Sequence, residues 1–388
     1  MVENIASTQN DPGLAASNAV RGSSTDAGVR IDVNNVTKQY ATSVAVADVS
    51  LAIEPGEFIT LLGPSGSGKT TTLNLIAGFT DLTSGSIEID GQRVDNIPPH
   101  KRNLGVVFQH YALFPHMTVE DNIAFPLVQR KVPASARKKA VADVLDVVGL
   151  DGYGKRYPKE LSGGQQQRVA FARAMVFEPR ALLMDEPLGA LDKNLREKLQ
   201  LEIKRIHQEV GRTFVFVTHD QEEALVLSDR IAIFNNGRIE QVGSSSELYE
   251  NPQTLFVATF MGESTVIKGQ PEWSGSEWTM GYHGSTLRGE ASNFGGAGSL
   301  VLRPEHIRLA RHLTDVPAGH QSIPAKVTQS IYLGSARKFE LELPDGTTGI
   351  VRGPLGDGAD LEPGDDVIAH WDPRNPKMLQ YVESRSTT

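Results

Sequence analysis

The chain of 388 residues contains no cysteine, which excludes a disulfide framework and metal sites built from thiolates. It also lacks any run of about 18 or more apolar residues, the length that a membrane-spanning helix requires. The first residues show neither a charged n-region nor an apolar h-region, so we expect no secretory signal. If the protein works at a membrane, other chains must supply the membrane-spanning part.

An excess of basic residues is missing as well. Lysine and arginine number 38 against 47 acidic residues, a formal net charge of -9, so we do not expect nucleic acid as a partner. The hydrophobic content of 39% is that of a soluble globular protein, and the length predicts two or three domains. Residues 1–29 have hardly any large apolar side chains, and we predict that they form a disordered tail.

The most informative stretch reads G-P-S-G-S-G-K-T over residues 63–70, a complete G-x-x-x-x-G-K-[ST] phosphate loop. Its glycines allow the tight turn in which successive N–H groups form an anion nest. Lys69 supplies a positive charge for the β- and γ-phosphates, and the hydroxyl of Thr70 can bind Mg²⁺. The glycines concerned are Gly63, Gly66 and Gly68.

The sequence around this loop supports the same interpretation. Residues 58–62 are apolar and predict a buried strand, and residues 71–78 predict a helix with one apolar face. The N-terminus of that helix would add the positive end of its dipole to the loop. The chance that a glycine-rich turn imitates the motif in this context is small.

Polar residues follow three further predicted strands, at the carboxyl ends where open α/β sheets bind ligands. Two neighbouring carboxylates there can hold Mg²⁺ and accept a proton from an attacking water. The alternatives are an acidic loop, a surface glutamine, and a histidine that serves the core or a helix cap. The residues are Gln109 after 104–108, Asp185 and Glu186 after 181–184, and His219 after 213–218.

Two other features remain open between two interpretations. Ser162, Gly163 and Gly164 begin a predicted helix over 165–177 and form either a second anion site or a plain serine cap. A second site would be redundant in one fold unless it served a nucleotide held by another copy of the chain. Tyr40 either stacks on an adenine ring or packs between two strands.

The C-terminal part has a different pattern. From about residue 264 the chain alternates short strands with Gly, Pro and Asp, which predicts an all-β, barrel-like domain. Within it we expect residues 274–298 to be loop, and residues 253–262 to be a bridge before it. The three tryptophans all lie in this part and are expected in its core: Trp273, Trp278 and Trp371.

Taken in order, these motifs strongly resemble the ATP-binding-cassette ATPases over about residues 30–245. The resemblance implies an α/β phosphate-loop fold with a β subdomain and a helical subdomain. It also implies a head-to-tail dimer, in which the loop of one subunit and residues 161–165 of the other close over one ATP. Soluble relatives in DNA repair carry a long arm after the equivalent of Gln109, and those in translation carry two cassettes. In this chain Leu161 follows Gln109 by 52 positions, too few for an arm, and there is one cassette. Intact Glu186 and His219 argue against an inactive sensor.

The resemblance also implies roles for individual residues. Glu186 becomes the general base, His219 its partner at the γ-phosphate, and Asp185 with Thr70 and Gln109 the set that positions Mg²⁺ and water. Asp192 would lie in the loop that couples the two sites. The predicted nucleotide contacts are Tyr40, Gly63, Pro64, Ser65, Gly66, Ser67, Gly68, Lys69, Thr70, Thr71, Ser162, Gly163, Gly164, Gln165 and Asp192.

Residues 264–388 resemble the oligomer-binding-fold (OB-like) regulatory domain, of the TOBE type, found on ATPases of bacterial solute importers, by G-E-S at 262–264, L-R-P-E-H at 302–306 and Y-L-G at 332–334. The first of these segments and residues 71–78 are most similar to the spermidine/putrescine (polyamine) branch. Iron, phosphonate, opine and sugar branches share much of the pattern. The predicted division is a tail at 1–29, a cassette at 30–262 with a helical subdomain at about 110–165, and a β domain at 263–388.

This resemblance also implies partners and a location. They are a homodimer of the ATPase, two integral membrane permease subunits and, indirectly, a solute-binding protein. The predicted location is the cytoplasmic side of the bacterial plasma membrane.

Overall fold

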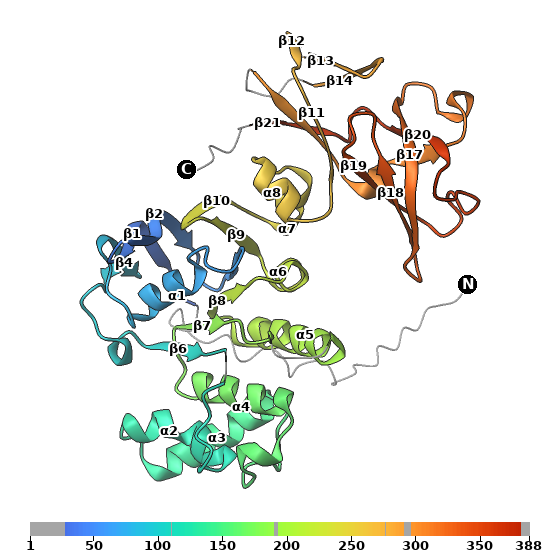
Figure 1. Ribbon diagram of the computed structural model, residues 1–388. Coiled ribbons are helices and arrows are strands. Elements are labelled where there is room, and N and C mark those ends of the chain that lie inside the picture. The colour runs from blue at the N-terminus through green and yellow to red at the C-terminus, as the bar shows by residue number, and fades with distance from the viewer. Residues whose placement is uncertain (1–27, 110, 190–192, 276, 291–295, 382–388) are drawn as a thin grey trace, which may run out of the picture.

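The structure is a computed structural model that describes residues 28–109, 111–189, 193–275, 277–290 and 296–381 (Figure 1). Figure 1 shows three regions: helices α2, α3 and α4 at one end, strands β11 to β21 at the other, and two sheets with their helices between them. None of the helices in the described ranges is long and apolar enough to cross a membrane. The predicted disordered tail lies almost entirely outside the described residues.

The central sheet has six strands in the order β10-β9-β3-β8-β7-β6. Strands β6, β7, β8, β3 and β9 are parallel, and β10 pairs antiparallel with β9. Because both faces are covered, β3 and β8 are continuous runs of buried residues. The strands are β3 (Phe58–Leu62), β6 (Leu104–Val107), β7 (Ala181–Asp185), β8 (Thr213–Thr218), β9 (Arg230–Asn235) and β10 (Arg238–Gly243).

A second, antiparallel sheet in the order β2-β1-β4-β5 shares an apolar core with the central sheet. Buried side chains from both sheets and from the helix after β3 form one core, which includes Ile31, Leu61 and Leu73. The elements are β1 (Ile31–Tyr40), β2 (Ser43–Ile53), α1 (Lys69–Ala77), β4 (Ser84–Ile89), β5 (Gln92–Arg93) and the 3-10 turn η1 (Pro99–Lys101).

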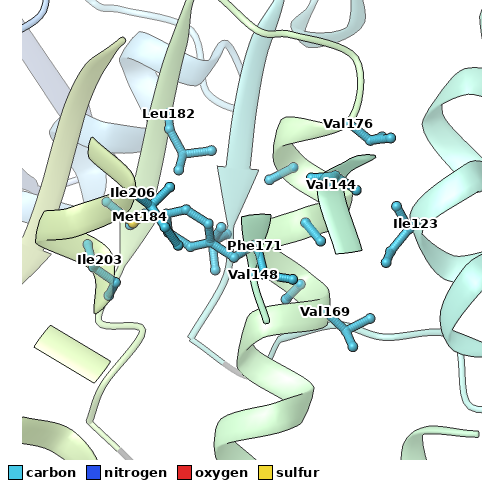
Figure 2. Packing of buried hydrophobic residues seen from close by; sticks show 14 of the residues in the cluster. Ile123, Val144, Val148, Val169, Phe171, Val176, Leu182, Met184, Ile203 and Ile206 are labelled. Atoms are coloured by element: carbon cyan, nitrogen blue, oxygen red, sulfur yellow. The ribbon is translucent and has the colours of Figure 1, made fainter. Parts of the chain in front are cut away.

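A helical lobe follows β6, and its last helix returns to the central sheet. Figure 2 shows Phe171 of that helix beside Met184 and Ile206, with Val144 and Ile123 of the lobe farther along. The helix therefore joins the lobe and the sheet through one apolar core. The elements are α2 (Val119–Gln129), α3 (Ala134–Val147), the 3-10 turn η2 (Pro158–Glu160) and α4 (Gly163–Met175).

Four helices complete the part before residue 262. Helix α5 packs Ile203 and Ile206 on the sheet, and Leu248 and Val257 of two short helices form a separate buried cluster with Ile231. They are α5 (Lys193–Val210), α6 (Gln221–Leu227), α7 (Ser245–Glu250) and α8 (Leu255–Phe260).

The remaining described residues form three antiparallel sheets, in the orders β11-β15-β21, β12-β13-β14 and β16-β20-β17-β18-β19. Trp278 and Trp371 are buried in their common core and Trp273 packs against it, as predicted. The elements are β11 (Thr265–Gly269), β12 (Glu272–Ser274), β13 (Glu277–Tyr282), β14 (Ser285–Glu290), β15 (Gly298–Leu302), η3 (Pro304–His306), β16 (Arg308–Ala310), η4 (Leu313–Asp315), β17 (Gln321–Tyr332), β18 (Arg337–Glu342), β19 (Thr348–Gly353), β20 (Asp366–Trp371) and β21 (Lys377–Gln380).

One local prediction is wrong. The stretch 274–298 was expected to be loop, but it contains the hairpin β13–β14, whose residues Trp278, Met280 and Tyr282 alternate into the core. A turn with positive φ at His283 and Gly284 joins the strands. Residues 253–262, for which no helix or strand was predicted, contain helix α8, which Thr254 caps. In both places tertiary burial outweighs the local composition.

Candidate functional site

The phosphate loop lies between β3 and α1, and its backbone requires the glycines. Gly66 and Gly68 have φ of 78° and 104°, in the left-handed region that side chains disfavour. At Gly63 a Cβ would come within 2.3 Å of the carbonyl oxygen of Phe234. Pro64 and Ser65 lie at the more open tip of the loop.

Two polar side chains of the loop, Ser67 and Lys69, are buried. Lys69 is almost fully buried, and its Nζ donates to the carbonyl oxygens of Gly63 at 2.7 Å and Pro64 at 2.8 Å. Burial lowers the pKa of Lys69, and the charges of Glu186 and Asp185 oppose that shift. The buried Ser67 Oγ has no hydrogen-bond partner among the described residues. A phosphate oxygen would satisfy this hydroxyl, so the loop fits an anionic ligand.

Helix α1 begins directly at Lys69 with Gly68 as its cap, and no side chain caps its first amides. The first N–H groups of a helix have no partner within the helix. Those of Thr70 and Thr71 are therefore available to a phosphate, and the helix dipole favours the same charge.

A hydroxyl and a carboxylate meet beside the loop. Thr70 Oγ1 donates to Asp185 Oδ1 at 2.9 Å, across from α1 to the end of β7. Burial raises the pKa of Asp185, and the neighbouring charge of Glu186 adds to the increase. Oxygen ligands of these two kinds are those that Mg²⁺ prefers. A cation here would also offset the burial of the carboxylate, so the pair fits Mg²⁺.

Glu186 lies where three parallel strands end. Gln109 Nε2 donates to Glu186 Oε2 at 3.3 Å, and His219 Nδ1 lies 3.3 Å from Glu186 Oε1. Glu186 has φ of 42°, an uncommon conformation for a glutamate, and its N–H donates to the carbonyl oxygen of Val217. Backbone strain of this kind concentrates at functional sites. Gln109 and His219, both predicted from strand ends, are thus brought to the two oxygens of the Glu186 carboxylate.

The second predicted anion site is a capped helix start. Gln165 N–H donates to Ser162 Oγ at 3.4 Å, and Ser162 N–H donates to Gln165 Oε1 at 3.0 Å. Gly164 packs on Leu195, while Ser162 and Gly163 are exposed. Ser162 is therefore a serine cap, and its helix start faces outward. In the described part of the chain, the side-chain hydrogen bonds of Ser162 and Gln165 stay within the helix start.

Two further predicted contacts have different outcomes. Tyr40 ends β1 and is 46% exposed, and the Lys38 ammonium lies 4.8 Å from its ring centroid. This exposure favours a ring available for stacking over a packed one. Asp192 lies outside the described residues.

The sequence analysis missed a polar cluster behind His219. Thr218 Oγ1 donates to a carboxylate oxygen of the buried Glu223 at 2.6 Å, and the N–H of Asp220 donates to Thr218 Oγ1. Arg196 of α5 forms ion pairs with Asp220 and Glu223. Burial raises the pKa of Glu223. The signal for this cluster was the cap pattern at the start of α6, where Asp220 precedes two glutamates.

The site combines a glycine-rich loop after a parallel strand with carboxylates at the end of β7, which lies two strands away from β3 in the sheet. This combination is typical of phosphate-loop ATPases. The comparisons with known proteins narrow this class. The ABC transporter family matches residues 46–189, and the TOBE domain family matches residues 300–376. The spermidine/putrescine import ATP-binding protein PotA of Thermobifida fusca is 45% identical over 94% of this chain and 97% of its own length.

Two other matches indicate the same class of protein. The uncharacterized ABC transporter ATP-binding protein YdcT of Escherichia coli is 46% identical over 92% of this chain and 99% of its own length. The ATP-binding cassette MJ0796, solved as a dimer in a post-hydrolysis state with ADP and Pi, is 35% identical with a TM-score of 0.50. That match covers 55% of this chain and 98% of the cassette.

The chain belongs to the family of ABC transporter ATP-binding proteins. It is an ATP-binding, ATP-hydrolysing transporter subunit, and the predicted fold class is confirmed for both the α/β part and the β-rich part.

Proposed function

We propose that this chain energises a bacterial importer as a head-to-tail homodimer that holds two ATP molecules. One observation carries the proposal: the chain has a complete phosphate loop and, separately, an exposed, capped helix start at Ser162. Helix N-termini bind anions. A second copy that places its Ser162 over the loop of the first would complete each site. The dimeric state of the similar cassette MJ0796 supports the pairing of two copies.

In the proposed site, Lys69 and the amides after Gly68 bind the phosphates, and Ser67 adds a hydroxyl. Thr70, Asp185 and Gln109 would hold Mg²⁺, which neutralises charge on the phosphates when it is bound. Glu186 accepts a proton from water at its carboxylate. Gln109 and His219 orient that carboxylate from its two sides.

We further propose that the cargo is a polyamine, because several relatives of about 45% identity carry spermidine/putrescine import in their names. Importers of iron, phosphonate, opine or sugar are the alternatives. Two permease subunits and a solute-binding protein complete the assembly at the cytoplasmic face of the membrane. Uptake of labelled putrescine by cells that express this chain with its permeases tests the cargo, and uptake of only another solute class contradicts it.

We also propose the division into a cassette at 30–262, with a helical subdomain at about 110–165, and a regulatory β domain at 263–388. The two major parts have separate apolar cores. A chain that ends at residue 262 is expected to hydrolyse ATP. Loss of hydrolysis in a truncation that is still folded would contradict this division.

The head-to-tail arrangement has a direct test, because the chain lacks cysteine. In a chain with Ser65→Cys and Ser162→Cys, oxidation with ATP should link the loop of one copy to the helix start of the other. Each single-cysteine variant is the control. Products that form only from like pairs, 65 with 65 or 162 with 162, would contradict the arrangement.

A further inference from the structure

The backbone at Tyr111 and Ala112, a few residues after Gln109, is strained. Tyr111 and Ala112 both have positive φ, 57° and 46°, and neither is a glycine. Consecutive side-chain-bearing residues in the left-handed region are uncommon and need support from their surroundings. The N–H of Tyr111 donates to the carbonyl oxygen of Phe108 at 2.9 Å. Tyr111, the first residue of the strained pair, is thus bound to the backbone of the residue just before Gln109.

One arginine of α4 supports this pair. Arg173 Nη1 donates to the carbonyl oxygen of Ala112 at 2.8 Å, and Nη2 donates to that of Tyr111 at 2.7 Å. Its guanidinium also lies 5.5 Å from the ring centroid of Phe114. The planar fork of an arginine can donate to two adjacent carbonyl oxygens in a fixed geometry, which a lysine ammonium cannot reproduce. Both strained residues are therefore fixed to α4 by one side chain.

The continuation of the segment is fixed to the helical lobe. Asn122 of α2 is fully buried and exchanges hydrogen bonds with both backbone groups of Phe114. It also donates to the carbonyl oxygens of Met117 and Thr118. The residues from 111 to 118 are consequently held by α2 and α4, so movement of these helices moves this segment, which begins two residues after Gln109.

Helix α4 reaches from this segment to the proposed second anion site. Arg173 lies 11 residues after Ser162, about 16 Å along a helix. Phe171 fixes the same end of α4 into the core shared with Phe214 of the central sheet. A displacement at the start of α4 is therefore transmitted along the helix to Arg173, which is hydrogen-bonded to Tyr111 and Ala112.

We propose that Arg173 is a positioning residue that couples the helix start at Ser162 to Gln109. The inference rests on the proposed function, in which Ser162 faces the ATP of the partner. Binding of the partner's ATP at Ser162 then fixes the position of α4. Through α4, Arg173 fixes the strained residues Tyr111 and Ala112, and Gln109 Nε2 can donate to Glu186. In this way each subunit orients its own Glu186 only when it also binds the ATP of its partner.

The test uses the full-length chain. Arg173→Lys keeps the positive charge and loses the planar guanidinium that donates to two carbonyl oxygens. It should lower kcat by about ten- to a hundredfold, while KM for ATP changes less than about twofold. Arg168→Lys is the matched control, because Arg168 lies on the same helix and donates to Val148 instead. In the Arg173→Lys background, Ala112→Gly should restore part of kcat, since glycine adopts positive φ without strain.

A second readout follows the strained segment itself. With Glu186→Gln to hold ATP, hydrogen exchange in residues 111–118 should slow on nucleotide binding, and adding Arg173→Lys should abolish that response while the dimer still forms. If Arg173→Lys proves unstable, the same comparison is made in the Ala112→Gly, Arg173→Lys protein. A retained response there would overturn the inference.

The outcomes separate the two proposals. No hydrolysis by the wild-type chain would overturn the proposed function. Wild-type hydrolysis with Arg173→Lys equal to Arg168→Lys would overturn only the coupling. A loss of ATP affinity equal to the loss of kcat, without rescue by Ala112→Gly, would show a structural role and would also overturn it.

Discussion

Replacing His219 with alanine removes one of the two nitrogen groups that lie against Glu186. His219 Nδ1 is 3.3 Å from Oε1, and Gln109 Nε2 is 3.3 Å from Oε2. The variant leaves the second contact and the backbone of β8 in place. Glu186 would lose the orientation of one oxygen.

The geometry sets the size of the effect. A hydrogen bond to a charged group contributes about 1.5–3 kcal/mol. The His219 side chain is 55% exposed and the distance is long, which places the contribution near the lower value. A barrier increase of about 1.4 kcal/mol corresponds to about a tenfold fall in kcat. Loss of the proposed contact with the γ-phosphate would deepen the fall to about a hundredfold.

The assay is steady-state ATP hydrolysis with the full-length protein and saturating Mg²⁺. Because the proposed role lies in orientation of the base, kcat should fall while KM for ATP changes little. His100→Ala is the control, since His100 is exposed in η1. Hydrolysis by His219→Ala at the wild-type rate would refute the orientation of Glu186 by His219.

Three other predictions concern affinity, stability and pH. Lys69→Ala should weaken ATP binding by about 2–5 kcal/mol because it removes the buried charge of the loop; unchanged affinity in calorimetry would remove Lys69 from the site. Arg303→Met should lower the free energy of unfolding by about 3 kcal/mol in denaturant titrations, because Arg303 donates to the carbonyl oxygens of Tyr249 and Ala258 from a buried position; an unchanged midpoint would contradict this. Burial lowers the pKa of His207 in the folded protein. As the pH falls below about 6.5, this histidine therefore takes up a proton more readily in the unfolded chain, and the free energy of unfolding decreases. His207→Gln should flatten that dependence in thermal melts, and an identical pH profile would rule out His207 as its source.

The site was largely predictable because local rules determine it. The phosphate loop is contiguous in sequence, and its glycines have the positive φ that the motif requires. Gln109, Glu186 and His219 are far apart in the chain. They meet because carboxyl ends of parallel strands share one edge of a sheet.

What could not be predicted depends on long-range burial. Helix α8 is six residues long and acquires its stability from Val257 and Ala258, which are buried against other parts of the chain. The hairpin β13–β14 lies in a segment rich in glycine and serine. The guanidinium of Arg173 donates to residues about 60 positions earlier in the chain, Tyr111 and Ala112. No short sequence motif predicts such a contact.

The central claim is that two copies of the chain close over ATP, and the most direct measurement is light scattering of Glu186→Gln with and without nucleotide. Gln is nearly isosteric and removes the base, so ATP should remain bound and intact. The account predicts a dimer with Mg²⁺ and ATP and a monomer with ADP. A protein that binds ATP and stays monomeric at every concentration tested would contradict the account.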